Sequence, residues 1–290
     1  SVRSVRATRR ALACPKLDGY QHRRGRLAVL NEMVEMTNIQ IISDRQYSLG
    51  ENPLWNTEER QLWWTDVYNQ CVYSYNPNNN EIMEMAKGRP VSSFAFIKNG
   101  GLICGCLDGL YLWNKADGFK KLDDNYNGEN LQINDGIADA KGRFLFGTFY
   151  YDGKNRNYTL GKLFIRDTNG VISVLDHGIH LSNGLGFSID NRLLYYADSV
   201  ARTIYRYEYD LRTGKVSNKR IYVRVPETQG IPDGLTVDSE DCVWSAQWYG
   251  ECIIRYDPDG NVRNRIQLPV KQVSSLTFGG DDMTDIYITT

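Results

Sequence analysis

A polar residue followed by alternating apolar positions recurs six times along the chain. These positions, which we call the starts, lie 41 to 50 residues apart: Glu51, Ser92, Asp135, Asn183, Asp233 and Ser274. In five repeats, the second and fourth residues after the start are apolar or proline, whereas the third repeat has Ile137 and then Asp139. Alternation with a period of two residues predicts a β-strand with one apolar face. We therefore expect a strand at each start.

Further short apolar runs follow each start, and turn sequences such as NPNNN at 76–80 and DPDG at 257–260 separate them. Each repeat thus predicts a meander of three or four strands. A repeat of about 40–50 residues with four strands is typical of a β-propeller. The sequence predicts an all-β fold, a six-bladed β-propeller over residues 36–290, in which the first strand of each blade lines a central channel and presents its start at one mouth.

The N-terminal segment differs from the rest of the chain in charge. Residues 1–31 carry eight basic residues and one acidic residue, although the net charge of the whole chain is −1. We expect residues 1–35 to form a basic extension outside the fold. An organellar targeting segment and an extension foreign to the natural protein both fit this composition. Without targeting, we expect a cytoplasmic protein.

Closure of the ring is expected to involve both ends of the chain. A propeller usually joins its last blade to its first by pairing strands from the two termini. The β-branched segment 37–43 is the best candidate, and we expect it to pair beside the strand that contains Tyr287. The sixth blade is then expected to be one strand short, because the chain contains only two strand-like runs after Val273.

Composition excludes several classes of protein. The chain is 41% hydrophobic and 24% charged, and no apolar run is long enough to span a bilayer, so we expect no membrane partner. Basic residues concentrate in the extension while the body is acidic, which argues against nucleic-acid binding. The cysteines lack the paired spacing of a zinc site, so reduced core thiols are favoured over disulfides or metal ligands. They are Cys14, Cys71, Cys104, Cys106, Cys242 and Cys252.

Three starts offer oxygen ligands in equivalent positions of their blades. An Asn-Gly or Asp-Gly pair taken alone is a common turn former, but Glu51, Asn183 and Asp233 would converge at one channel mouth. Two carboxylates and an amide oxygen suit calcium, magnesium or manganese, with zinc as a further candidate. A cation would also neutralise the repulsion between the two carboxylates. The chain has only three histidines and no GxSxG motif, which disfavours a nucleophilic triad.

Several stretches together resemble one known family. GENPLW at 50–55, INDGIADAKGRFLFGT at 133–148, LSNGLGFS at 181–188 and IPDGLTVDSEDCVWSAQW at 231–248 are similar to segments of regucalcin (senescence marker protein), gluconolactonases and luciferin-regenerating enzyme. The resemblance runs in order from about Ile39 to Thr290. It implies a six-bladed propeller that binds one divalent cation in its channel and hydrolyses sugar lactones. The metal ligands it implies are again Glu51, Asn183 and Asp233.

The resemblance also implies substrate contacts. Asn134 matches a substrate-binding asparagine, Gln132 stands where the family commonly has arginine, and Asp152 lies near the place of a family glutamate. The implied mechanism uses the cation to polarise the lactone carbonyl while Asp233 activates water.

Three functional hypotheses follow. The first is a lactonase, and the second is a hydrolase of other esters or phosphotriesters at the same site, a possibility left open by Gln132. The third is a non-enzymatic calcium-binding or interaction propeller, although the Gly-His and Trp-Asp dipeptides of WD repeats are absent. A panel of lactones, aryl esters and phosphotriesters tested with several cations distinguishes them.

Overall fold

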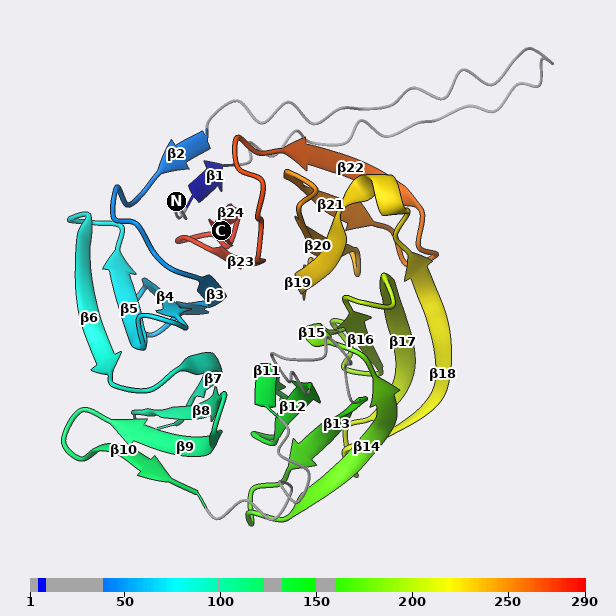
Figure 1. Cartoon of the computed structure of the whole chain (residues 1–290), viewed down its shortest axis with the longest axis horizontal. Coiled ribbons are helices and arrows are strands. Elements are labelled where there is room, and N and C mark those ends of the chain that lie inside the picture. Colours follow the sequence, from blue (N-terminus) through cyan, green and yellow to red (C-terminus); the bar gives the residue numbers. More distant parts are fainter. Residues whose placement is uncertain (1–4, 9–38, 99, 123–131, 150–159) are drawn as a thin grey trace, which may run out of the picture.

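The computed structural model describes residues 5–8, 39–98, 100–122, 132–149 and 160–290. These residues form six four-stranded sheets arranged around a common centre (Figure 1). The one helix within these ranges is a 3-10 turn, η1 (Glu227–Gln229). None of the described residues belongs to a helix with the length and apolar character needed to cross a bilayer.

Five sheets are built from four consecutive strands. In chain order, they contain β3 (Gly50–Asn56), β4 (Gln61–Asp66), β5 (Cys71–Asn76) and β6 (Glu81–Lys87); β7 (Val91–Phe96), β8 (Leu102–Cys106), β9 (Gly109–Asn114) and β10 (Gly118–Lys121); β11 (Gln132–Ala138), β12 (Phe144–Phe149), β13 (Gly161–Arg166) and β14 (Ile172–Ile179); β15 (Ser182–Phe187), β16 (Leu193–Asp198), β17 (Thr203–Asp210) and β18 (Lys215–Arg224); and β19 (Ile231–Val237), β20 (Val243–Trp248), β21 (Cys252–Tyr256) and β22 (Val262–Gln267). The last sheet combines β23 (Ser275–Gly279) and β24 (Asp285–Thr289) with β1 (Val5–Thr8) and β2 (Ile39–Ile41).

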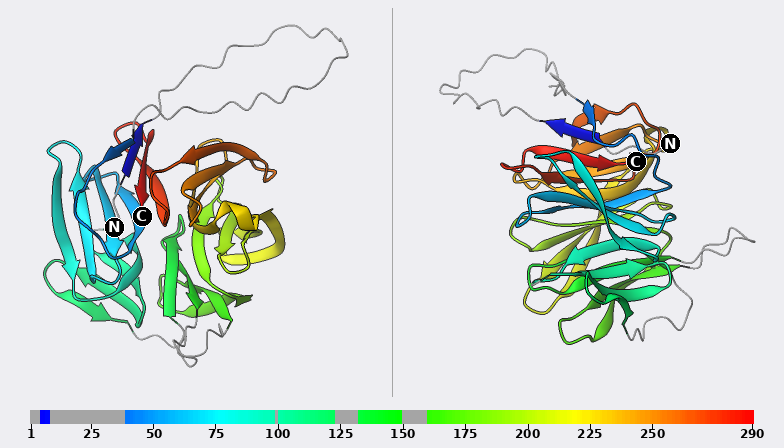
Figure 2. Two further views of the ribbon diagram at one scale, coloured as in Figure 1. Left: turned by 45° about the horizontal axis from the view of Figure 1, so that its top comes forward. Right: turned by 90° about the vertical axis from the view of Figure 1, so that its left-hand side faces the viewer.

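One strand of each sheet, the one at or directly after the start, lies at the centre of the ring. Strands β3, β7, β11, β15, β19 and β23 contact one another in cyclic order, and β23 contacts β3 to complete the circle. Figure 2 shows the same ring tilted and from its side. The predicted all-β propeller is therefore confirmed, and each of the six sequence repeats corresponds to one four-stranded sheet.

The hydrophobic core is divided into six layers, one between each pair of neighbouring sheets. Alternation explains this division, because successive side chains of a strand point to opposite faces. In β4, Trp63 packs against the second sheet with Phe94, whereas the adjacent Trp64 packs toward the last sheet with Tyr287. Each blade therefore buries both faces, as its uninterrupted apolar runs predict.

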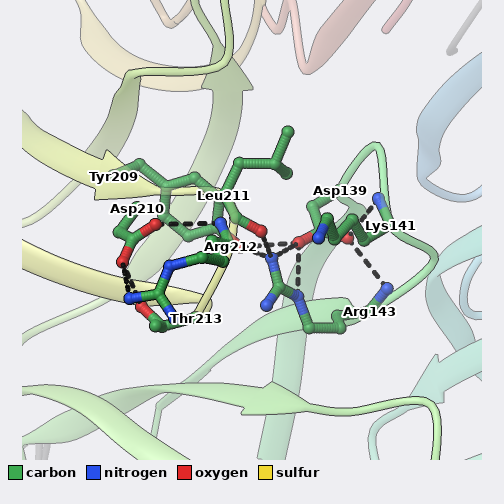
Figure 3. A network of polar contacts seen from close by, with 8 residues as sticks. All are labelled: Asp139, Lys141, Arg143, Tyr209, Asp210, Leu211, Arg212 and Thr213. Carbon is green, nitrogen blue, oxygen red and sulfur yellow. Dashed lines mark hydrogen bonds and ion pairs between the residues drawn. The ribbon is translucent and has the colours of Figure 1, made fainter.

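A buried polar network ties the third sheet to the fourth (Figure 3). Arg143 donates from Nε to Asp139 Oδ2 at 2.6 Å and from Nη2 to the carbonyl of Leu211 at 2.6 Å, while the hydroxyl of Tyr209 donates to Asp139 Oδ2 at 2.7 Å. Gly214 leaves room for this guanidinium, since a Cβ there would lie 2.8 Å from Arg143 Nη1. Asp139, the residue that broke the apolar pattern of the third repeat, therefore has a structural role between blades.

The last sheet corrects three expectations. Its order is β2-β1-β24-β23, so Ile39–Ile41 belongs to the sixth blade as expected but pairs with β1 rather than beside Tyr287. Arg6 of β1 is the residue opposite Tyr287. The sheet is not one strand short, and the expectation that residues 1–35 lie outside the fold is wrong for Val5–Thr8. The remainder of that extension lies outside the described residues.

The cysteines within the described ranges are free and buried. Burial raises the pKa of the Cys104 and Cys252 thiols, which keeps them protonated and unreactive. The expected place in the core is confirmed for these five residues, which form no disulfide with one another, while Cys14 lies outside the described part of the chain.

Candidate functional site

The starts occupy equivalent places on the inner strands. Glu51, Asn183 and Asp233 lie in the first half of β3, β15 and β19, respectively, and Asp135 is the middle residue of β11. Ser92 lies in β7, and Ser274 immediately precedes β23. Because the inner strands surround one centre, these side chains gather at the same end of the ring.

Backbone irregularities occur at the starts. The pairing register of the inner strand shifts between Glu51 and Leu54, between Asn183 and Leu185, and between Pro232 and Leu235. Such bulges leave a residue unpaired and redirect its side chain, and they are common beside active sites. Asp233 is therefore within a strand rather than on a turn before it, contrary to the turn reading of its Asp-Gly pair.

The glycine after two of the starts allows inner strands to approach closely. A Cβ at Gly184 would lie 2.5 Å from the carbonyl oxygen of Asp233, and one at Gly234 would lie 2.1 Å from Ser275 Oγ. Neither glycine has a positive φ. These glycines are required by packing between neighbouring blades and not by turn geometry.

Three carboxyl groups influence one another's ionisation at this end of the ring. Burial raises the pKa of Glu51 well above its ordinary value, and the charges of Asp233 and Asp135 raise it further. Burial, followed by the charge of Asp135, likewise raises the pKa of Asp233. Burial raises the pKa of Asp135 to about 7. Asp135 was expected only as a start and not as a site residue, and it joins the site through these interactions.

Asn183 adds a neutral oxygen donor beside these carboxyl groups. It is buried, and a hydrogen bond from its side chain partly lowers the pKa of Asp233. Asp233 is also buried, and its Oδ1 atom has no hydrogen-bond partner. A buried carboxylate oxygen without a donor is costly unless a proton or a cation satisfies it.

This donor set fits a divalent cation only when the amide is included. Among the residues that the structure describes, no group of three histidine, cysteine, aspartate or glutamate side chains could hold an ion. Glu51 and Asp233 supply two carboxylates, and Asn183 supplies the third oxygen. Mixed carboxylate and amide oxygens are suitable ligands for calcium and other hard cations.

The expected substrate contacts lie on or near β11. Asn134 is half-buried and donates from Nδ2 to the carbonyl of Ser182 at 2.7 Å, so its amide nitrogen links two blades. Gln132 is the first residue of β11 and is also half-buried. Asp152 lies outside the described residues.

Two buried aspartates hold the loops that lead into ligand-bearing strands. Asp66 accepts hydrogen bonds from the backbone N–H groups of Ser48 and Leu49, just before Glu51. Asp198 accepts equivalent bonds from His180 and Leu181, just before Asn183. Sequence analysis missed both residues, although the repeated aspartate in LWWTD and LLYYAD was a detectable signal.

A cavity of about 350 Å³ extends along the centre of the ring from these starts. Asp135 and Asn52 line it, together with residues farther along the inner strands such as Phe187, Thr236 and Thr277. The three expected ligands are not among its lining residues, so the candidate cation site lies at one end of the channel and this cavity lies beyond it.

Comparison with known proteins identifies relatives over most of the chain. Residues 49–290 match the family described as SMP-30/Gluconolactonase/LRE-like region. Pentonolactonase XacC of Haloferax volcanii is 35% identical over 253 residues, covering 86% of this chain and 84% of that protein. Regucalcin of Xenopus laevis is 31% identical, with 87% and 86% covered. The 6-deoxy-6-sulfogluconolactonase of Pseudomonas putida is 32% identical, with 83% and 82% covered.

Solved structures agree with these matches. A luciferin-regenerating enzyme aligns with a TM-score of 0.74 at 25% identity, covering 84% of this chain and 92% of that chain. A calcium-binding protein, regucalcin, from Agrobacterium tumefaciens aligns with a TM-score of 0.75 at 25% identity, covering 83% and 82%.

Proposed function

Because this chain belongs to the SMP-30/Gluconolactonase/LRE-like family, we propose that it is a divalent-cation-dependent hydrolase that opens sugar lactones. The observation that carries the proposal is the set of oxygen donors at the inner-strand starts, where Asp233 has a buried, unpartnered oxygen. Relatives named pentonolactonase and 6-deoxy-6-sulfogluconolactonase support sugar lactones as the substrate class.

Glu51, Asn183 and Asp233 would hold the cation. Calcium, magnesium, manganese and zinc are all compatible with these ligands, and the calcium-binding regucalcin structure supports calcium as the first choice. The bound cation would supply Lewis-acid polarisation of the lactone carbonyl.

The remaining chemistry belongs to the side chains. Asp233 accepts a proton from the water that attacks the carbonyl carbon and returns it to the ring oxygen as the ring C–O bond breaks, so that this oxygen leaves as a hydroxyl group. Asn134 and Gln132 orient the sugar hydroxyls from β11, and we assign the same task to Asp152. The product is the open-chain hydroxy acid.

Gln132 favours one alternative substrate class. A neutral side chain where the family commonly has arginine provides no fixed positive charge for sugar recognition, which suits a hydrolase of other esters or phosphotriesters at the same site. Assaying pentono- and hexonolactones, aryl esters and phosphotriesters with each of the four cations tests both proposals. Turnover of lactones alone supports the first, and turnover of the other substrates alone replaces it with the second.

Replacing Asn134 with alanine should mainly affect substrate binding. We expect the Michaelis constant for the best lactone to rise roughly tenfold, which corresponds to the loss of one or two hydrogen bonds, with a smaller change in kcat. Steady-state kinetics measures both constants. A fall in kcat at an unchanged Michaelis constant would contradict the role of Asn134 in substrate binding.

The raised carboxyl pKa values predict how stability depends on pH and cation. For a cation-free protein, Glu51, Asp135 and Asp233 retain protons in the folded state that they lose in the unfolded state, so their contribution to stability falls as pH rises above about 4. For Asp135 this loss is complete near its folded pKa of about 7. A coordinated cation replaces protons, and its stabilising effect should therefore increase with pH.

Melting curves at pH 5 and pH 8, with a chelator or with a millimolar cation, measure this linkage. We expect the cation to raise Tm more at pH 8 than at pH 5, and we expect Asp233→Asn to reduce the difference. An equal increase at both values of pH would argue against carboxylate ligands.

A further inference from the structure

Side-chain hydrogen bonds connect neighbouring sheets close to the starts. At five of the six junctions, a side chain donates to a backbone carbonyl that lies one or two residues before a start. The bonds are Ser274 Oγ to Gly50 O at 2.5 Å, Thr65 Oγ1 to Val91 O at 2.7 Å, Ser92 Oγ to Ile133 O at 2.8 Å, Asn134 Nδ2 to Ser182 O at 2.7 Å, and Ser199 Oγ to Pro232 O at 2.7 Å. Each bond therefore fixes the backbone that precedes a start relative to the neighbouring sheet.

Ser199 differs from the other donors because it also contacts a proposed cation ligand. Asn183 Nδ2 lies 3.0 Å from Ser199 Oγ. A serine hydroxyl has one hydrogen, and the carbonyl of Pro232 can only accept. Ser199 must therefore donate to Pro232 and accept from Asn183, so Asn183 has to present its NH2 group to Ser199.

This arrangement determines which way the Asn183 amide faces. An asparagine side chain has two orientations of nearly equal shape, which differ in the positions of Oδ1 and Nδ2. Only the oxygen can bind a cation. Ser199 is 3% exposed and Asn183 is 7% exposed, so water has little access to replace the bond between them. With Nδ2 on Ser199, Oδ1 lies on the opposite edge of the amide.

We propose that Ser199 is a positioning residue that orients Asn183 so that Oδ1 is available to the cation. The inference rests on the proposed function and assigns a role to a residue that does not itself touch the cation or the substrate. The same hydroxyl holds Pro232, the residue before Asp233, and thereby connects two of the three ligands. Loss of such supporting bonds typically lowers metal affinity by about 10–100-fold.

Calorimetric titration of the cation-free protein tests the proposal without relying on turnover. Calcium, magnesium, manganese and zinc chlorides are titrated into the wild type, and the cation that binds most tightly is used for the variants. We expect Ser199→Ala to lower its affinity about 10–100-fold. Ser199→Cys, which keeps a similar size but is a weak acceptor, should also lower it, whereas Ser199→Thr retains the hydroxyl and should restore most of the affinity.

A matched control removes the same kind of bond elsewhere. Thr65→Val eliminates the donor to Val91, which precedes Ser92 and no proposed ligand. Its cation affinity should match that of the wild type. A loss as large as that of Ser199→Ala would show that any broken bond between sheets weakens the site, and the specific role of Ser199 would be rejected.

The decisive measurement uses Asn183→Asp as the background. A carboxylate has an oxygen on either edge, so it needs no neighbour to choose its orientation. In this background, we expect Ser199→Ala to change the cation affinity by less than about threefold. This change is well below the one expected in the wild-type background, where residue 183 is asparagine. An equal loss in both backgrounds, or an undiminished affinity of Ser199→Ala in the wild-type background, overturns the proposal. Failure of the wild type to bind any of the four cations instead rejects the proposed function on which it rests.

Discussion

We expect Asp233→Ala to abolish the proposed lactone hydrolysis and to leave the propeller intact. This side chain is proposed both to hold the cation and to accept a proton from water, so its removal should reduce kcat/KM by about 10²–10⁴-fold or more. Folding should not suffer, because Asp233 belongs to a group of mutually repelling carboxyl groups and its Oδ1 atom has no hydrogen-bond partner. In the cation-free protein, the substitution removes a buried carboxyl oxygen that has no hydrogen-bond partner.

Steady-state kinetics measures the loss of activity, and circular dichroism measures whether the fold is retained. Asp259→Ala is the matched control, because it makes the same substitution at an exposed position of the same sheet. Its activity should equal that of the wild type. Undiminished turnover by Asp233→Ala, with an unchanged spectrum and melting profile, would remove Asp233 from the mechanism. Loss of the folded spectrum would instead show that Asp233 is needed for packing.

Arg143→Ala should cause a large loss of stability. The guanidinium is almost fully buried between the third and fourth sheets and bonds to Asp139 and to the backbone of Leu211. Its removal leaves the Asp139 carboxylate buried without its cationic partner, which typically costs about 3–5 kcal/mol. The free energy of unfolding should fall by that amount.

Arg212 provides a close comparison, since it forms an ion pair with Asp210 in the same region (Figure 3). Both members of this pair are exposed, Arg212 at 81% and Asp210 at 48%, so Arg212→Ala should change stability by no more than about 0.5 kcal/mol. Urea unfolding of the three proteins measures the difference. Similar unfolding free energies for the two variants would contradict the importance of the buried network.

The repeats revealed the fold because each one carries the same local pattern. Starts spaced at regular intervals predicted the inner strands, and apolar runs predicted blades that are buried on both faces. The strand β1 was missed for a physical reason: Val5–Thr8 is short, lies in an arginine-rich segment, and pairs with β24 from the other end of the chain. Local sequence carries little information about a pairing partner so distant.

The site was predictable where a residue's role follows from its place in a repeat. Glu51, Asn183 and Asp233 could be selected because their repeats align, and the selection remains a proposal. Ser199 and Asp198 were not selected, because they act through hydrogen bonds to backbone groups and to a neighbouring amide. Which groups become partners depends on how two sheets pack together. The spacing of residues along the sequence does not specify that packing. The turns expected at the Asn-Gly and Asp-Gly pairs were wrong for the same reason. Their glycines, Gly184 and Gly234, are needed because a neighbouring blade packs closely against them.

The last sheet combines β1 and β2 with β23 and β24, and this pairing affects the order and rate of folding. Val5 pairs opposite Ile288, so one sheet can be completed only after nearly the whole chain has been synthesised and its ends have met. Contacts between residues so far apart in sequence carry a high entropic cost of loop closure and slow folding. The other five sheets consist of consecutive strands and can form from local hairpins. Ring closure is therefore expected to be the late step of folding, during which the outer edge of β24 is open to pairing with another chain.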